Sequence, residues 1–123
     1  MARAIQNLFV KASEICRSRA TATFFLTLMI EAVTLLFRFG FGLKSTQHTA
    51  STVGRLTFGI RIHHGYIGLL MLIILVIPRL RKSSLEPLIT VIGTSLFVSD
   101  IIHHTILYYV TGSADLDLIY PNY

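Results

Sequence analysis

The chain has 123 residues, of which 53% are hydrophobic and only 14% are charged. A soluble domain usually carries about a quarter of charged residues, so this composition excludes an ordinary water-soluble globule and indicates an integral membrane protein. The formal net charge of +5 reports membrane topology and contact with anionic lipid rather than nucleic acid binding, so we expect the bilayer as a partner and no nucleic acid. The single cysteine, Cys16, excludes an internal disulfide and a cysteine-based zinc site.

The N-terminal segment, residues 1–20, has the pattern of an amphipathic helix. Ile5, Leu8 and Ile15 recur at the spacing that brings side chains to one face of a helix, and the charged residues lie mostly around the other side. We expect this helix to lie in the headgroup plane of a bilayer. Docking on a partner protein and an organelle-targeting presequence are the alternative interpretations.

Three apolar segments follow, each long enough to cross a hydrocarbon core of about 30 Å at about 1.5 Å per residue. The sequence therefore predicts an all-α, polytopic membrane protein with a single membrane domain. The predicted spans are residues 21–43, 58–78 and 87–110, separated by an outer loop at 44–57 and a basic cytoplasmic turn at 79–86 and followed by an outer tail at 111–123.

Basic residues are distributed unevenly between the two sides of this arrangement. Four lie before the first predicted span and three in the turn at 79–86. The opposite side has only Lys44 and Arg55, with Arg61 at the boundary. Because positive loops stay in the cytoplasm, the sequence predicts a plasma or inner membrane protein whose N-terminus is cytoplasmic and whose C-terminus is outside.

Ionisable residues interrupt all three predicted spans, although each costs at least about 2.5 kcal/mol at the centre of a bilayer. They are Glu31 and Arg38 in the first span, His63 and His64 in the second, and Asp100, His103 and His104 in the third. Counted from the cytoplasmic helix ends, they lie about 15–25 Å deep, in a layer about 10 Å thick in the outer half of the bilayer.

Helical angles place most of these groups on one face of each span. In the first span Glu31 and Arg38 share a stripe, and in the third the acid and both histidines fall within an arc of about 100°. In the second span His64 shares its face with Arg61, whereas His63 is expected to point about 100° away. Because lipid favours apolar contacts, we expect the three polar faces to meet inside the protein.

Neutral imidazoles and carboxylates in a layer of low dielectric are ligands for Zn, Fe, Mn or Cu, so the sequence predicts a transition-metal site. Its candidate ligands are His64, Asp100, His103, His104 and Glu31. Arg38 and Arg61 are candidate anion- or substrate-binding residues, because guanidinium groups bind phosphate and carboxylate bidentately. A metal-bound water could attack a lipid-like substrate, while redox chemistry with oxygen is an equal alternative, and no catalytic residue is assigned.

Three further interpretations fit the same residues. A b-type haem could be ligated by histidines of neighbouring helices, for example His64 and His103. The acids and imidazoles could instead form hydrogen-bonded pairs that fix helix packing. Because three helices enclose little volume, the chain could also be a structural subunit of a larger membrane complex, and we expect a homo-oligomer or other membrane subunits as partners.

Overall fold

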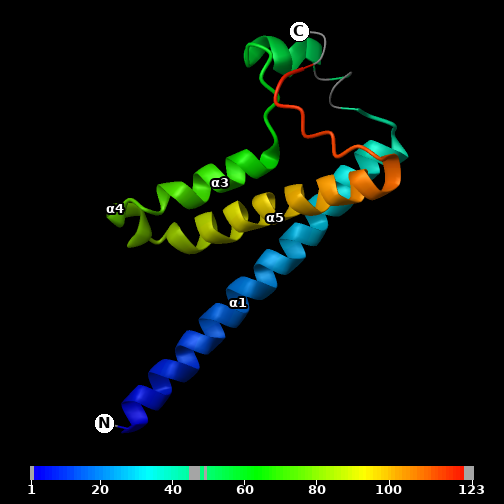
Figure 1. The fold of residues 1–123 in the computed structure, drawn as a ribbon. Helices are drawn as coiled ribbons and strands as arrows, with labels where there is room; N and C mark the ends of the chain where they lie inside the picture. Colours follow the sequence, from blue (N-terminus) through cyan, green and yellow to red (C-terminus); the bar gives the residue numbers. More distant parts are fainter. Residues whose placement is uncertain (1, 45–47, 49, 121–123) are drawn as a thin grey trace.

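The structure, a computed structural model, describes the backbone of residues 2–44, 48 and 50–120; the side chains of residues 2–5, 8, 9, 12, 16 and 50 lie outside that description. Its described part is built from helices joined by irregular segments, as the sequence predicted (Figure 1). In chain order the elements are α1 (Ala2–Leu35), a π-helical turn η1 (Leu36–Gly40), a second π-helical turn η2 (Ala50–Gly54), α3 (His64–Ile74), α4 (Pro78–Arg81) and α5 (Glu86–Thr111).

The first helix is continuous where the sequence analysis expected two segments divided after residue 20. No glycine or proline occurs between residues 2 and 39, so nothing in the sequence terminates the helix before Gly40. The first half of α1 projects away from the other helices (Figure 1). The apolar face expected at Ile5 and Leu8 lies outside the described side chains, and Ile15 is exposed.

The second predicted span, residues 58–78, contains a helix of only 11 residues, α3. Phe58 and Gly59 have φ values of 53° and 83°, which a right-handed helix does not accommodate, and a turn after Ile74 precedes Pro78 and α4. Within the described residues, two helical stretches are long and apolar enough to cross a membrane by length and composition: Ser13–Gly40 and Glu86–Thr111.

The helix α5 packs against both α3 and α1. Between α3 and α5 the approach is close, because a Cβ atom on Gly68 would lie 2.5 Å from the carbonyl oxygen of Gly93. The two helices are antiparallel, because Gly65 meets Asp100 whereas Gly68 meets Gly93. Between α1 and α5 the contacts run in parallel, from Arg19 with Glu86 near the start of α5 to Glu31 with His103 near its end. One side of α5 therefore faces α3, and another side faces α1.

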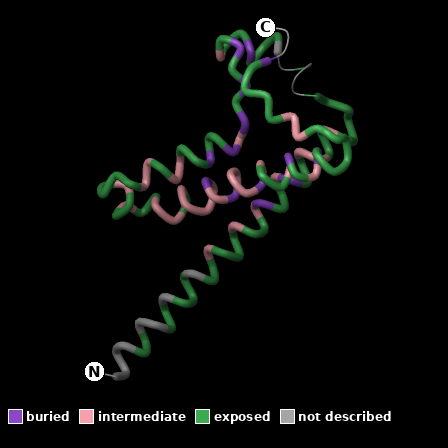
Figure 2. The backbone as a smooth tube through the Cα atoms, in the orientation of Figure 1, coloured by how far each residue is buried: buried purple, intermediate pink, exposed green. Residues whose placement is uncertain are grey.

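Burial in this structure is the reverse of that in a soluble domain. Among the side chains that the structure describes, the buried hydrophobic ones are Leu107 and Tyr120, whereas the buried polar and charged ones are Thr27, Glu31, Arg61, His63, Ser95, Ser99 and His104. Large apolar side chains point outward from the helices, for example Phe24, which is 60% exposed, and Phe25, which is 64% exposed. Figure 2 shows buried residues mainly where the helices and the tail meet.

Candidate metal centre

The side chain of His63 reaches α5 because this residue precedes the first turn of α3. Its backbone is extended, with φ −84° and ψ 144°, so the helical angle used in the sequence analysis does not apply to it. Asp100 and His104 lie one turn apart on α5 and face α3. The prediction that His63 points about 100° away from the face of His64 was therefore wrong: both histidines lie beside Asp100, and the His63 side chain contacts His104 and is 7% exposed.

Three side-chain atoms form a compact triangle at this place. His104 Nε2 lies 3.0 Å from His63 Nδ1 and 3.6 Å from Asp100 Oδ1, and the third side, from His63 Nδ1 to Asp100 Oδ1, is 4.0 Å. A point equidistant from the three atoms is about 2.1 Å from each, and zinc lies about 2.0–2.2 Å from imidazole and carboxylate ligands. The group His63, Asp100 and His104 could therefore hold a metal ion.

Backbone carbonyls of the C-terminal tail orient both imidazoles. His104 Nδ1 is hydrogen-bonded to the carbonyl of Ala114, and His63 Nε2 lies 3.4 Å from the carbonyl of Asp117. Because a carbonyl only accepts a hydrogen bond, His104 Nδ1 and His63 Nε2 carry the ring hydrogen. In neutral imidazoles, His104 Nε2 and His63 Nδ1 then direct their lone pairs toward each other. A cation or a proton shared between two such nitrogens, 3.0 Å apart, would stabilise the pair. Metal-bound histidines commonly have this outer hydrogen bond.

The carboxylate of Asp100 has the environment expected of a ligand. Among the described residues, its buried Oδ1 atom has no aligned hydrogen-bond donor, although His64 Nδ1 lies 3.3 Å from it. His64, a predicted ligand, is thus beside the group of three and not part of it. Its Nε2 atom is also buried without a hydrogen-bond partner in the described part of the chain.

The two remaining candidate ligands form a separate pair between α1 and α5. His103 Nδ1 lies 3.2 Å from Glu31 Oε1, and the hydroxyl of Ser99 donates to Glu31 Oε2 at 3.3 Å. The arc of polar residues on α5 is therefore divided, with His103 facing α1 and with Asp100 and His104 facing α3. The structure does not gather all five predicted ligands at one point.

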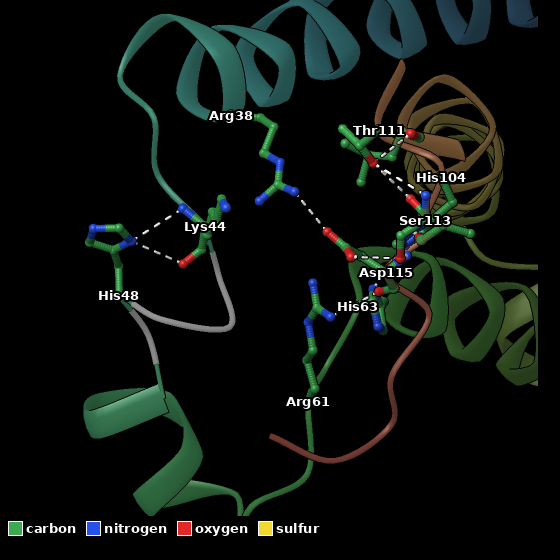
Figure 3. A network of polar contacts seen from close by, with 11 residues as sticks. Arg38, Lys44, His48, Arg61, His63, His104, Thr111, Ser113 and Asp115 are labelled. Carbon is green, nitrogen blue, oxygen red and sulfur yellow. Dashed lines mark hydrogen bonds and ion pairs between the residues drawn. The ribbon is translucent and has the colours of Figure 1, made fainter. Parts of the chain in front are cut away.

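Both groups adjoin a cavity of about 350 Å³. Asp100 and the four histidines His63, His64, His103 and His104 line it, together with both candidate anion-binding arginines, Arg38 and Arg61. Arg38 Nη2 lies 2.8 Å from Asp115 Oδ2, and Arg61 Nη1 donates to the backbone carbonyl of Asp115 at 2.8 Å (Figure 3). The arginines and the group of three thus share one cavity.

Sequence reasoning missed His63 and the contribution of the tail, residues 113–120. The signal for the tail was charge: Asp115 and Asp117 are acidic residues predicted on the same side as Arg38 and Arg61. The signal for His63 was weaker, because only the start of α3 decides which of the two adjacent histidines reaches His104.

No family model matches the chain, and no curated protein or solved structure matches it either. Its function is therefore inferred from the chemistry of the side chains alone.

Proposed function

We propose that this protein is a small helical membrane protein that binds a transition metal ion through His63 Nδ1, His104 Nε2 and Asp100 Oδ1. One observation carries the proposal: the three atoms surround a point at about the bond length of zinc, while the two imidazoles are held by carbonyls in the tautomers that coordination needs. Because Asp100 Oδ1 is buried without an aligned donor in the described residues, a cation would also compensate it.

The membrane assignment is supported by the reversed burial and by the course of the chain. Exposed phenylalanines and buried acids and histidines suit a hydrocarbon solvent, where polar groups must find partners inside the protein. Since α1 and α5 are parallel, a return of the chain between them is needed, and we assign it to α3 and the residues next to it. The 11 residues of α3 cover about 16 Å, and the segment before α3 is hydrogen-bonded to the tail at Gly59 and Arg61.

Two imidazoles and one carboxylate suit zinc, iron, manganese or copper. Catalytic zinc sites typically have three protein ligands and keep one position for water or substrate, whereas structural sites have four. The group of three resembles the former kind and adjoins the cavity. We propose metal binding and assign no catalytic residue.

The first test is elemental analysis of the full chain, purified in a mild non-ionic detergent, followed by titration of the metal-free protein with Co²⁺ and competition by Zn²⁺. We expect about one metal ion per chain and an affinity at least about tenfold lower in His63→Ala and in His104→Ala. His48→Ala, in the exposed loop, is the matched control and should bind as the wild type does.

The same titration distinguishes the ligands proposed from the structure, which include His63, from those predicted from the sequence, which include His103. His103→Ala should change the affinity by less than His63→Ala does, because His103 faces Glu31. Metal binding that is absent, or that is insensitive to both His63→Ala and His104→Ala, would refute the proposal. A Soret band in the purified protein would instead indicate haem.

A further inference from the structure

Two arginines from different parts of the chain converge on one residue of the tail. Arg38 extends from η1, Arg61 from the segment before α3, and Figure 3 shows both guanidinium groups directed toward Asp115. The carboxylate of Asp115 pairs with Arg38 at 2.8 Å, and its backbone carbonyl accepts from Arg61 at 2.8 Å. Both arginines are largely buried, with 15% of the Arg38 side chain and 7% of Arg61 exposed.

The arrangement has the chemistry of a site for an anionic group. Guanidinium groups bind phosphate and carboxylate oxygens through charge-assisted hydrogen bonds, and two of them on one cavity wall can share the oxygens of a single group. Asp115 provides a charged carboxylate oxygen to Arg38 but only a neutral backbone carbonyl to Arg61. A phosphate, in contrast, would provide charged oxygens to both arginines.

The rest of the cavity indicates the other part of the ligand. Beside the polar residues, Phe37, Leu43, Val53, Ile62 and Leu107 line it. Phe37 and Leu43 are also 49% and 41% exposed, so the apolar lining continues onto the outer surface. A volume of about 350 Å³ accommodates a headgroup and the first part of an alkyl chain.

We propose that Arg38 and Arg61 bind the phosphate or carboxylate group of an amphiphile, and that Asp115 occupies this site in the ligand-free protein. The inference adds a ligand class to the proposed metal protein, because both sites line the same cavity. An entering anion takes the place of the Asp115 carboxylate and moves the tail. Asp115 has a φ of 48°, a backbone region that few non-glycine residues adopt, so its position is maintained by these contacts.

The test uses the full chain, metal-free, in a non-ionic detergent, titrated calorimetrically with decyl phosphate. Asp115→Asn should bind it at least about fivefold more tightly, because the competing carboxylate is removed. Arg38→Gln should bind it at least about tenfold more weakly, because the bidentate contact is lost. The matched controls are Asp117→Asn, in the same tail, and Arg79→Gln, exposed on α4, and both should behave as the wild type.

Two further arms identify the ligand. Inorganic phosphate should bind at least about tenfold more weakly than decyl phosphate, because it lacks the apolar part; equal affinity would overturn the assignment to an amphiphile and indicate free phosphate. In wild-type protein, decyl phosphate should raise hydrogen–deuterium exchange in residues 113–120, whose amides include Tyr120 N–H bonded to Gly59. This second measurement does not depend on any variant folding.

The outcomes distinguish the two proposals. The anion site would be overturned if decyl phosphate bound Asp115→Asn, Arg38→Gln and their controls with equal affinity and left hydrogen–deuterium exchange of the tail unchanged. The metal site would not be affected by that result. Retained anion binding together with failed metal titration would overturn the metal site alone.

Discussion

Glu31 is a buried acid, 6% exposed, whose partners lie on the neighbouring helix. It accepts a hydrogen bond from Ser99 and pairs with His103, so two polar groups of α5 depend on its carboxylate. This arrangement favours a role in helix packing for Glu31, which the sequence analysis had placed among the metal ligands.

Replacing Glu31 by alanine should therefore weaken the fold and leave metal affinity nearly unchanged. The buried Ser99 and the partly buried His103 lose their partner, and we expect the free energy of unfolding to fall by about 1–3 kcal/mol. Thermal unfolding followed by circular dichroism in detergent measures the effect. Glu14→Ala, on the exposed part of the same helix, is the control. Equal melting temperatures of the two variants would contradict this interpretation.

The elements are positioned by a close approach of α3 to α5. A Cβ atom on Gly68 would meet the backbone of α5 at two points, 2.5 Å from the oxygen of Gly93 and 2.7 Å from the nitrogen of Phe97. A Cβ atom on Gly65 would lie 2.5 Å from a carboxylate oxygen of Asp100. Small residues at both places allow the helices to approach closely enough for His63 to reach His104.

Gly68→Ala should separate α3 from α5, because the added Cβ atom would clash with backbone atoms of α5, which cannot change rotamer as a side chain can. We expect a loss of about 1–3 kcal/mol in the free energy of unfolding, and a lower metal affinity because His63 moves away from Asp100 and His104. Leu70→Ala, which truncates a side chain that is 61% exposed on the same helix, should affect metal affinity little. Unfolding and Co²⁺ titration of both variants provide the measurements, and a Gly68→Ala protein with unaltered affinity would speak against this packing.

Periodicity and spacing predicted a helical fold and the faces of residues that lie inside helices. Asp100 and His104 lie together on α5, and Glu31 faces inward on α1, as the helical angles required. The same method failed for His63, because a helical angle was applied to a residue with extended backbone. It also predicted a longer second helix than α3, His64–Ile74, because large apolar residues continue before it at Phe58, Ile60 and Ile62 and after it at residues 75–77.

The tail could not be placed from the sequence for a different reason. Its contacts with Arg61, His63 and His104 are made largely by backbone carbonyls, at Asp115, Asp117 and Ala114. Every residue carries a carbonyl, so residue type gives no sign of such a contact. Only the charges of Asp115 and Arg38 offered a clue.

For the whole molecule, the parallel course of α1 and α5 predicts that their starting ends lie on the same side of a membrane. Together with the excess of basic residues near those ends, this predicts a cytoplasmic N-terminus and an outer tail. Labelling of intact cells with a membrane-impermeant maleimide tests it. The native Cys16 should react only after lysis, and Leu116→Cys in a Cys16→Ser background should react in intact cells.

Reaction of both positions from the same side would contradict three crossings. Association with further copies or with other membrane subunits stays a prediction, and crosslinking in native membranes measures it. The many exposed apolar side chains of the helices provide surface for lipid or for such partners.

The tail also has a practical consequence for handling this protein. Its carbonyls fix the ring orientation of His63 and His104, while Asp115 neutralises Arg38, so eight residues act on both functional features at once. A chain shortened to Gly112 would keep every proposed metal ligand and yet release both imidazoles to rotate. Purification tags are therefore better placed at the N-terminus, where α1 projects away from the other helices (Figure 1).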